Sequence, residues 1–440
     1  MQIYKFSKCY RRKFQWSNQL KFPVELYVTQ NSSNSIRSHL FPARRGRTER
    51  SRKKMIMNFK FLIFILTMFL SGAEAQKKPL VKACVASITT SSTFKGTICK
   101  GTLIFEDLFN TIDPLKWTNE VTMAGGGNNE FQVYWNGSVA PKNASVNTVV
   151  TSGVLGIRPY FLSQAYSEAF LSSGNLNLGK FCTASWNNGC NRTGTTSLIL
   201  PPITSARLHT IDTFNFKYGK VEVRARLPAG DWIWPAIWMM PKKSAYGQWP
   251  RSGEIDIMES RGNRDLGSFN GGKNIGVELS SSTMHWGPDP GNNKFMKTSW
   301  EKSTAKGMGY DKDFHLYQVE WTADYVKFSI DNNETGRVTP PAGGFWQLGN
   351  FSSSLTNLWA NGTKMAPFDQ EFFLILNVAV GGTSGFFPDG ISNPKPKPWS
   401  NASPNTAFKD FWSKRADWEP TWMTDGTTAL KIDYVRVWAI

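Results

Sequence analysis

The sequence predicts an all-β sandwich of two stacked antiparallel sheets for most of the chain. Segments in which apolar and polar residues alternate recur along it, and this period of two is typical of half-buried strands. Patterns of capped amphipathic helices are scarce. Neither a linker nor an internal repeat interrupts residues 101–440, so we expect one large domain rather than two.

The predicted strands can be followed in order along the chain. Residues 220–227 (KVEVRARL) alternate apolar with charged side chains. Residues 317–332 (YQVEWTADYVKFSIDN) predict two strands around a turn at 322–324. Residues 371–382 (EFFLILNVAVGG) form an apolar run that ends in glycines and is typical of a buried central strand. The C-terminal residues 430–440 are rich in β-branched and aromatic side chains.

The formal net charge of +18 on this chain of 440 residues is concentrated at one end. Residues 1–60 hold 15 Lys and Arg against 2 acidic residues, whereas the rest of the chain holds 36 basic and 31 acidic residues. A nearly balanced charge over the main domain gives little support to nucleic-acid binding. We therefore expect no nucleic-acid partner.

An apolar run of residues 61–70 precedes the predicted domain. It follows Met57 and a lysine, and it ends in an Ala-x-Ala motif before Gln76. This pattern favours a cleaved secretory signal peptide over a membrane anchor, because a membrane-spanning helix needs about 20 apolar residues. We assign residues 55–75 to the signal peptide and expect no membrane association after cleavage. Residues 1–54 are interpreted as a disordered basic extension or as upstream sequence read from an earlier start.

Cysteines and glycosylation sequons agree with secretion. Four cysteines lie downstream of the leader, at Cys84, Cys99, Cys182 and Cys190. Three pairings are possible, and we expect the two local ones, so that the first would staple a polar lead-in of residues 76–100. Asn-x-Ser/Thr sequons stand at Asn136, Asn143, Asn191, Asn333, Asn350, Asn361 and Asn401. Together these features predict a glycosylated extracellular protein.

The octapeptide GEIDIMES crowds Glu254, Asp256 and Glu259 into six residues. In a regular strand Glu254 and Asp256 share one face, the isoleucines face the core, and Glu259 points the wrong way. A β-bulge in which Ile257 and Met258 occupy one position would bring all three acids to one face. The uneven spacing therefore predicts a bulge, with Met258 as the inserted residue.

Two carboxyl groups on one face suit retaining glycoside hydrolysis, whose nucleophile and acid/base stand about 5–5.5 Å apart. The nucleophile must be ionised while the acid holds a proton, and crowded like charges help to separate the two pKa values. The alternative is a solvated edge strand whose acids merely face water. Nearby tryptophans favour a sugar-binding surface, although such residues are also common in cores: Trp232, Trp234, Trp238 and Trp249.

Other motifs give less support to a different chemistry. The four histidines have no metal-ligand spacing, and the sequence contains neither a P-loop nor a GxSxG motif. The glycine-rich residues 125–131 (GGGNNEF) lack the strand–helix context of a phosphate-binding loop. They form either a flexible loop or a loop that presents Asn128, Asn129 and Glu130 to sugar hydroxyls.

The acidic motif resembles the E-x-D-x-x-E catalytic signature of glycoside hydrolase family 16. The resemblance to animal endo-β-1,3-glucanases (laminarinases) covers about residues 100–440, and we assign 101–440 to the catalytic domain. Besides the motif, the matching segments stand in family order at 125–134, 218–241, 259–263, 283–287, 364–390 and 432–439.

The resemblance implies a β-jelly-roll with a concave substrate cleft. It implies Glu254 as nucleophile, Glu259 as acid/base and Asp256 as the residue that assists them. The substrate-binding residues that it implies are Trp232, Trp234, Trp249, His285, Asn129, Glu130 and Arg261. No cofactor is required, but some relatives hold a structural calcium, for which Glu106 and Asp433 are the candidate ligands.

We therefore expect a secreted, monomeric endo-β-1,3-glucanase that hydrolyses laminarin-type glucans by retaining double displacement. Two alternatives are a non-catalytic β-glucan-binding protein of innate immunity and the same fold acting on another polysaccharide, such as a β-1,3-1,4-glucan or a galactan. The intact acids favour the enzyme over the binding protein. So does the lead-in of residues 76–100, which is too short for an additional N-terminal glucan-binding module.

Overall fold

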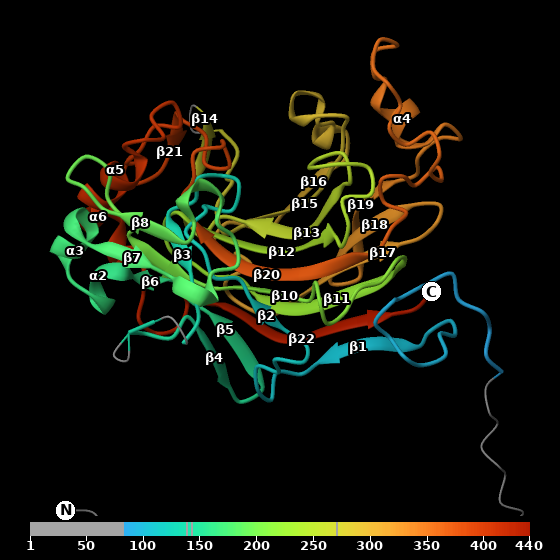
Figure 1. Ribbon diagram of the computed structural model, residues 1–440, viewed down its shortest axis with the longest axis horizontal. Helices are drawn as coiled ribbons and strands as arrows, with labels where there is room; N and C mark the ends of the chain where they lie inside the picture. Colours follow the sequence, from blue (N-terminus) through green and yellow to red (C-terminus); the bar gives the residue numbers. More distant parts are fainter. Residues whose placement is uncertain (1–82, 138–139, 142–143, 270–271) are drawn as a thin grey trace, which may run out of the picture. The chain divides into compact units, whose positions relative to one another are not determined.

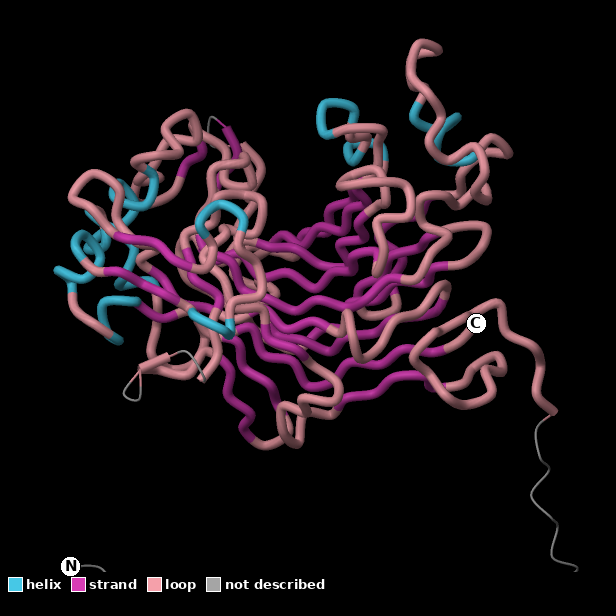
Figure 2. The backbone as a smooth tube through the Cα atoms, in the orientation of Figure 1, coloured by secondary structure: helices cyan, strands magenta, loops and turns pink. Residues whose placement is uncertain are grey.

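Two antiparallel sheets form the framework of the structure (Figures 1 and 2). This computed structural model describes residues 83–137, 140–141, 144–269 and 272–440; the predicted signal peptide and residues 1–54 lie outside this part. The eight-stranded sheet contains β1 (Leu103–Asp107), β4 (Thr148–Thr151), β5 (Val154–Ile157), β11 (Gly219–Arg226), β17 (His315–Trp321), β18 (Val326–Ile330), β19 (Asn333–Val338) and β22 (Leu430–Trp438). The seven-stranded sheet contains β2 (Thr118–Asn119), β10 (Arg207–His209), β12 (Ile233–Pro241), β13 (Glu254–Ser260), β15 (Leu279–His285), β16 (Ser299–Ser303) and β20 (Phe372–Val380).

The strand order differs from the chain order in both sheets. It is β19-β18-β17-β11-β22-β5-β4 in the first, where β1 also pairs with β22, and β16-β15-β13-β12-β20-β10-β2 in the second. Smaller sheets join β14 (Gly267–Phe269) to β21 (Ile391–Ser392), β7 (Asn175–Asn177) to β8 (Asn191–Thr193), and β3 (Gln132–Tyr134) and β6 (Tyr160–Phe161) to β9 (Ile203–Ser205).

Helices are short and lie in the connections between strands (Figure 2). They are α2 (Leu162–Ala165), α3 (Glu168–Ser173), α4 (Gly344–Gly349), α5 (Ala407–Ser413) and α6 (Arg415–Trp418), with 3-10 helices η1 (Gly179–Phe181), η2 (Trp186–Asn188), η3 (Pro290–Asn292), η4 (Phe295–Lys297) and η5 (Glu419–Thr421). In the described part of the chain, the helices fall short of the length and apolar character that a bilayer crossing requires.

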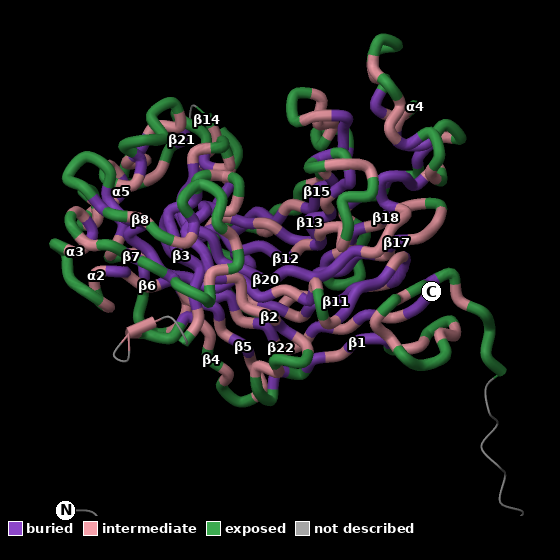
Figure 3. Tube along the Cα trace, in the orientation of Figure 1, coloured by how far each residue is buried: buried purple, intermediate pink, exposed green. Residues whose placement is uncertain are grey.

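The inner faces of the two sheets share one hydrophobic core. In β11 the alternating Val221, Val223 and Ala225 are fully buried, as the sequence pattern predicts. β20 is buried along its whole length (Figure 3), because it lies between β12 and β10 inside its sheet. Each such buried aliphatic side chain contributes about 1.5–3 kcal/mol relative to exposure. The predicted sandwich of antiparallel sheets is therefore confirmed.

Two local predictions are also confirmed. The turn at 322–324 joins β17 to β18, and the N–H of Thr322 donates to the carbonyl of Tyr325 at its close. The disulfides are the two local ones, with Cα atoms 5.2 Å apart in Cys84–Cys99 and 5.4 Å apart in Cys182–Cys190.

The lead-in packs against the ends of the main sheets. The N–H of Ile88 donates to the carbonyl of Ile440, and Thr90 and Lys217 exchange two backbone hydrogen bonds. Glu371, which precedes β20, accepts hydrogen bonds from the N–H and hydroxyl of Ser92. Residues 83–100 therefore belong to the same compact unit as the strands.

The two candidate calcium ligands lie on the eight-stranded sheet, where each is paired with an arginine. Glu106 accepts a hydrogen bond of 2.8 Å from Nε of Arg436, and Asp433 accepts one of 2.6 Å from Nη1 of Arg224. A calcium ion requires six to eight oxygen ligands without competing cations. Arginines therefore contact both carboxylates, and a calcium ion at Glu106 and Asp433 stays a prediction.

The outer face of the seven-stranded sheet is bordered by raised loops. The segment with α4 rises on one side of the view and the segments with β14 and β21 rise on the other (Figure 1). β12, β13 and β15 cross the outer face between these raised loops. The outward side chains of the three strands therefore lie on a surface that loops flank at both ends.

Candidate active site

β13 is bulged in the middle of the acidic motif. On its β12 side, Met258 pairs with Ile237. Asp256 pairs with the next residue, Trp238, so Ile257 has no partner on β12. The predicted bulge is confirmed, but the extra residue on this side is Ile257 rather than Met258.

The β15 side of the strand shows the same irregularity. Asp256 pairs with Thr283. Glu259 pairs with Ser281, so two residues of β13 lie opposite one residue of β15. Ile257 and Met258 are fully buried in the core, whereas the acids gather on the outer side. The bulge thus corrects the parity of the strand, as the uneven spacing predicts.

His285 lies at the centre of the three acids. It is the β15 residue that pairs with Glu254, and its Nε2 is 3.9 Å from Oε1 of that glutamate. The same nitrogen is 3.3 Å from Oδ2 of Asp256. The charge of His285 also acts on the pKa of Glu259. The structure therefore brings together the three predicted catalytic residues and the predicted histidine.

Each glutamate has an indole donor of its own. Nε1 of Trp234 donates to Oε1 of Glu259 at 3.0 Å. Nε1 of Trp249 donates to Oε2 of Glu254 at 2.8 Å. Trp249 is 41% exposed, so its ring is available to a ligand on this face. Trp234 is buried to 8% exposure and stacks on Phe386 with 3.8 Å between ring centroids, so it acts mainly as a fixed hydrogen-bond donor.

Burial and mutual repulsion shift the pKa values of the cluster. Burial raises the pKa of Glu259, and the charge of Glu254 adds to this effect against the opposing influence of His285. Burial, with the charges of both glutamates, raises the pKa of Asp256 well above its usual range. Burial alone would lower the pKa of His285, but the surrounding carboxylates raise it to about 9. At neutral pH the site therefore holds a cationic histidine, and the raised pKa values of Asp256 and Glu259 favour their protonated forms.

Glu254, Asp256 and His285 place potential metal-ligand atoms within 4.8 Å of one another. A histidine must be neutral to coordinate a metal ion. Because the pKa of His285 is raised to about 9, its ring is cationic at neutral pH and interacts with the acids as an ion pair. A metal ion would have to displace the proton of His285, and we interpret this cluster as acid–base chemistry.

Trp232 does not line the site. Its side chain is only 1% exposed and packs edge-to-face against Phe387 and Trp399 in the core. Its backbone N–H donates to Oδ1 of Asn263, which holds the residue in the turn before β12. The prediction that Trp232 contacts sugar is wrong, because the turn directs this ring inward while Trp234 reaches Glu259.

The glycine-rich loop separates its two predicted ligand-binding residues. Asn129 is exposed, so its role as a sugar contact stays a prediction. Glu130 is 3% exposed and accepts hydrogen bonds from Gln132 and Tyr134, with Nη2 of Arg207 at 3.6 Å. The prediction that Glu130 contacts sugar is wrong, because this buried network occupies its carboxylate.

Arg261 reaches the site through an aromatic ring. Its Nε donates to the carbonyl of Phe386 at 2.8 Å, and its guanidinium lies 4.1 Å from the centroid of that ring. Phe386 in turn stacks on Trp234. Burial lowers the pKa of Arg261 to about 10, against the opposing charge of Glu259. Arg261 therefore supports Trp234 indirectly, through Phe386. Direct contact of Arg261 with substrate stays a prediction.

The sequence reasoning missed the loop after β15 that holds His285. Nδ1 of His285 and Nδ2 of Asn293 are 2.8 Å apart, and the ring of Phe295 stacks on the imidazole with 5.2 Å between centroids. Phe295 and Met296 are 39% and 82% exposed. The only signal was an aromatic residue in a turn-rich segment that follows the family match at residues 283–287, and this signal is too weak to indicate a role.

Comparison with known proteins adds the family. The model of "Glycosyl hydrolases family 16" matches residues 179–363. The "Beta-1,3-glucan-binding protein" of Penaeus monodon is 48% identical over 348 residues, which cover 76% of this chain and 90% of that protein. "Beta-1,3-glucan-binding protein 1" of Galleria mellonella is 35% identical over 81% of this chain and 67% of its own length.

Among solved structures, the laminarinase from Rhodothermus marinus is similar at 26% identity and a TM-score of 0.47, over 77% of this chain and 98% of that one. The matched family model and the extent of the Penaeus relative lead to one conclusion: this chain belongs to glycoside hydrolase family 16.

Proposed function

We propose that this protein binds β-1,3-glucan on the outer face of the seven-stranded sheet and hydrolyses it with retention of configuration. The observation that carries the proposal is the pair Glu254 and Glu259, brought to one face by the bulge, each held by its own indole N–H. The names of the relatives support the polysaccharide. They do not support hydrolysis, which rests on the chemistry of the two glutamates.

Glu259 is suited to the role of acid. Burial raises its pKa, which favours the protonated form, and this form donates its proton to the glycosidic oxygen as the bond breaks. The hydrogen bond from Trp234 fixes Oε1, which leaves the other oxygen for the proton. After the leaving group departs, the ionised Glu259 takes a proton from the attacking water.

Glu254 is suited to the role of nucleophile. The N–H of Trp249 and the cationic His285 both favour negative charge on its carboxylate. The carboxylate attacks the anomeric carbon and forms a glycosyl ester, which water then breaks to return the free carboxylate.

Asp256 assists without touching the reacting bond. Burial and the charges of both glutamates raise its pKa well above its usual range, which disfavours a second negative charge beside Glu254. Its contact with His285 keeps the imidazole between the acids. We assign Asp256 and His285 to positioning and to charge balance.

Secretion is part of the proposal. The two disulfides suit an oxidising compartment, since such bonds are rare in the cytosol. Four predicted glycosylation asparagines are exposed: Asn191, Asn333, Asn350 and Asn361. The predicted sequon at Asn143 lies outside the described residues.

The second candidate is a binding protein without catalysis, which the names of the Penaeus and Galleria relatives favour. The experiment measures reducing ends released from laminarin and retention on insoluble β-1,3-glucan with the same protein preparation. We expect both, and nuclear magnetic resonance should detect the β-anomer first among the new reducing ends. Retention on glucan without any release would establish the binding protein instead.

A further inference from the structure

A second concave site lies on the eight-stranded sheet, away from the acids. A cavity of about 420 Å³ opens where β4 and β5 meet the end of β22. Its apolar lining includes Val149, Val154 and Tyr160, and its basic lining consists of Arg158, Arg226 and Lys431. This volume falls in the range of about 300–1,000 Å³ typical of small-molecule sites. We call it the basic pocket.

Two cations of the basic pocket face each other directly. Arg226 of β11 pairs in register with Lys431 of β22. Like charges directly opposite each other on antiparallel strands are destabilising. Burial and the charge of Arg226 both lower the pKa of Lys431. The fold thus keeps a repulsive pair at the mouth of a cavity.

The pair has no close counter-charge within the chain. An ion pair requires a carboxylate oxygen within 4.0 Å of a side-chain nitrogen. Among the described residues, no carboxylate oxygen lies this close to the side-chain nitrogens of Arg158, Arg226 or Lys431. The charge of Asp425 acts on both Lys431 and Arg226, and the exposed carboxylate of Asp425 accepts hydrogen bonds from Thr427. The positive charge of the pocket is therefore left for an external anion.

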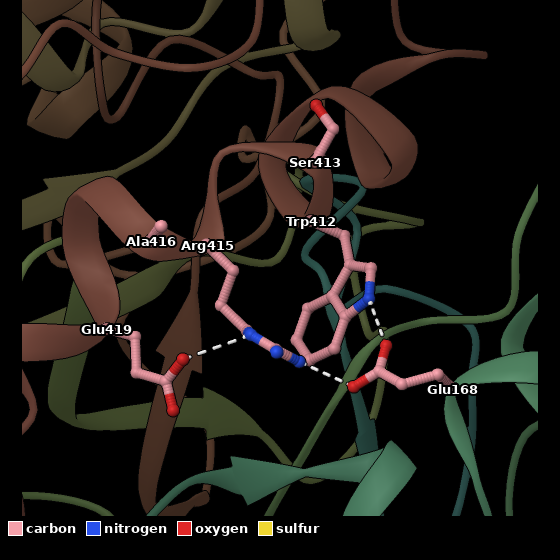
Figure 4. Close-up of a pocket in the computed structure, with 6 residues that line it drawn as sticks. All are labelled: Glu168, Trp412, Ser413, Arg415, Ala416 and Glu419. Carbon is pink, nitrogen blue, oxygen red and sulfur yellow. Dashed lines mark hydrogen bonds and ion pairs between the residues drawn. The ribbon is translucent and has the colours of Figure 1, made fainter.

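A second cavity on the molecule differs from the basic pocket in its charge balance. In Figure 4 the guanidinium of Arg415 lies between two acids, with ion pairs to Glu168 and Glu419, and Nε1 of Trp412 also donates to Glu168. That cavity of about 340 Å³ neutralises its own cation. The described residues that line the basic pocket include no acid, and this difference sets it apart from the cavity at Arg415.

We propose that the basic pocket binds a single-chain amphipathic carboxylate, such as a fatty acid. Its alkyl chain would lie against Val149, Val154 and Tyr160, and its carboxylate would lie beside Arg226 and Lys431. In the structure the side chain of Val149 is 50% exposed. A bare phosphate would leave this apolar surface uncovered, so the apolar wall argues for a ligand with an alkyl chain. The limited volume of about 420 Å³ argues for a single molecule rather than a membrane surface.

The experiment is calorimetric titration of the protein with decanoate. Acetate keeps the charge without the chain, and decanol keeps the chain without the charge, so both should bind at least about tenfold more weakly. The double variant R226Q/K431Q should lose at least about tenfold in decanoate affinity. Arg415→Gln, at the neutralised cavity, is the matched control and should bind as the wild type does.

Two measurements keep the result clear. The melting temperature without ligand should not fall in R226Q/K431Q, because the variant removes a repulsion, so lost binding cannot be blamed on misfolding. Laminarin hydrolysis should be unchanged in that variant. The proposal is overturned if decanol binds as well as decanoate, if R226Q/K431Q keeps full affinity, or if only anionic vesicles are bound.

Discussion

Like charges are crowded in two regions of this molecule, and the two regions resolve the crowding differently. On the outer face of the seven-stranded sheet, Glu254, Asp256 and Glu259 stand close to a cationic His285. In the basic pocket, Arg226 and Lys431 face each other without a close acid. The first region balances its charge internally and thereby prepares proton transfer. The second leaves its charge unbalanced, which suits the capture of an anion.

The largest effect is expected at the nucleophile of the internally balanced region. Glu254→Gln keeps the shape and the Trp249 contact but cannot form the glycosyl ester, so laminarin hydrolysis should fall by at least about 10³-fold. Binding to insoluble glucan, measured in parallel, should be retained. Hydrolysis at the wild-type rate by a folded Glu254→Gln protein would refute the catalytic assignment.

Glu259→Gln should lower hydrolysis by about 10²–10⁴-fold, the usual contribution of a general acid. In the wild type, activity should decline as pH rises through the raised pKa of Glu259, because the proton to be donated is then lost. Rate measurements across pH should find that this decline disappears from the residual activity of Glu259→Gln. An unchanged alkaline decline in the variant would assign the acid to another group.

His285→Gln tests whether the histidine charge holds the acids together. The pKa of His285 is raised to about 9 in the folded protein, from 6.5 ordinarily, so its stabilising effect is complete below 6.5 and disappears as pH rises through about 9. We expect a destabilisation of up to about 3 kcal/mol at pH 6, as for a broken buried ion pair, and little at pH 10. Denaturant unfolding at both pH values measures it; an equal loss at both would indicate packing alone.

The smallest effect is expected in the region without counter-charge. Arg226→Gln removes the repulsion with Lys431 and should raise the free energy of unfolding by about 0.2–1 kcal/mol in the absence of ligand. The gain should shrink at high salt, which screens the wild-type repulsion. A clear loss of stability in low salt would show that Arg226 has an attractive partner after all.

Much of the architecture was predictable because it depends on neighbours in the chain. The alternation in residues 220–227 places valines on the inner face of β11 regardless of what lies across from it. The two disulfides join cysteines 15 and 8 residues apart, so few other arrangements compete with them. The strands at 317–332 and 371–382 were predictable for the same reason, because their patterns of apolar residues are formed by neighbours in the chain.

The predictions that proved wrong concern side chains whose surroundings come from elsewhere in the chain. Trp232 and Trp234 stand two residues apart, yet Trp399 and Phe387 enclose the first while the second reaches Glu259. Glu130 turns inward because Arg207 offers it a buried partner. Burial of one residue by a distant one leaves no period or motif in the sequence.

By itself, then, the sequence determined the sheet periodicity, the pairing of cysteines and the bulge, since the spacing of Glu254, Asp256 and Glu259 is a property of six consecutive residues. Only the tertiary structure decided which side chains stand around those acids and that Arg226 meets Lys431 across two strands. The physical reason is that backbone parity is local, whereas charge balance and burial depend on segments far apart in the chain that folding brings into contact.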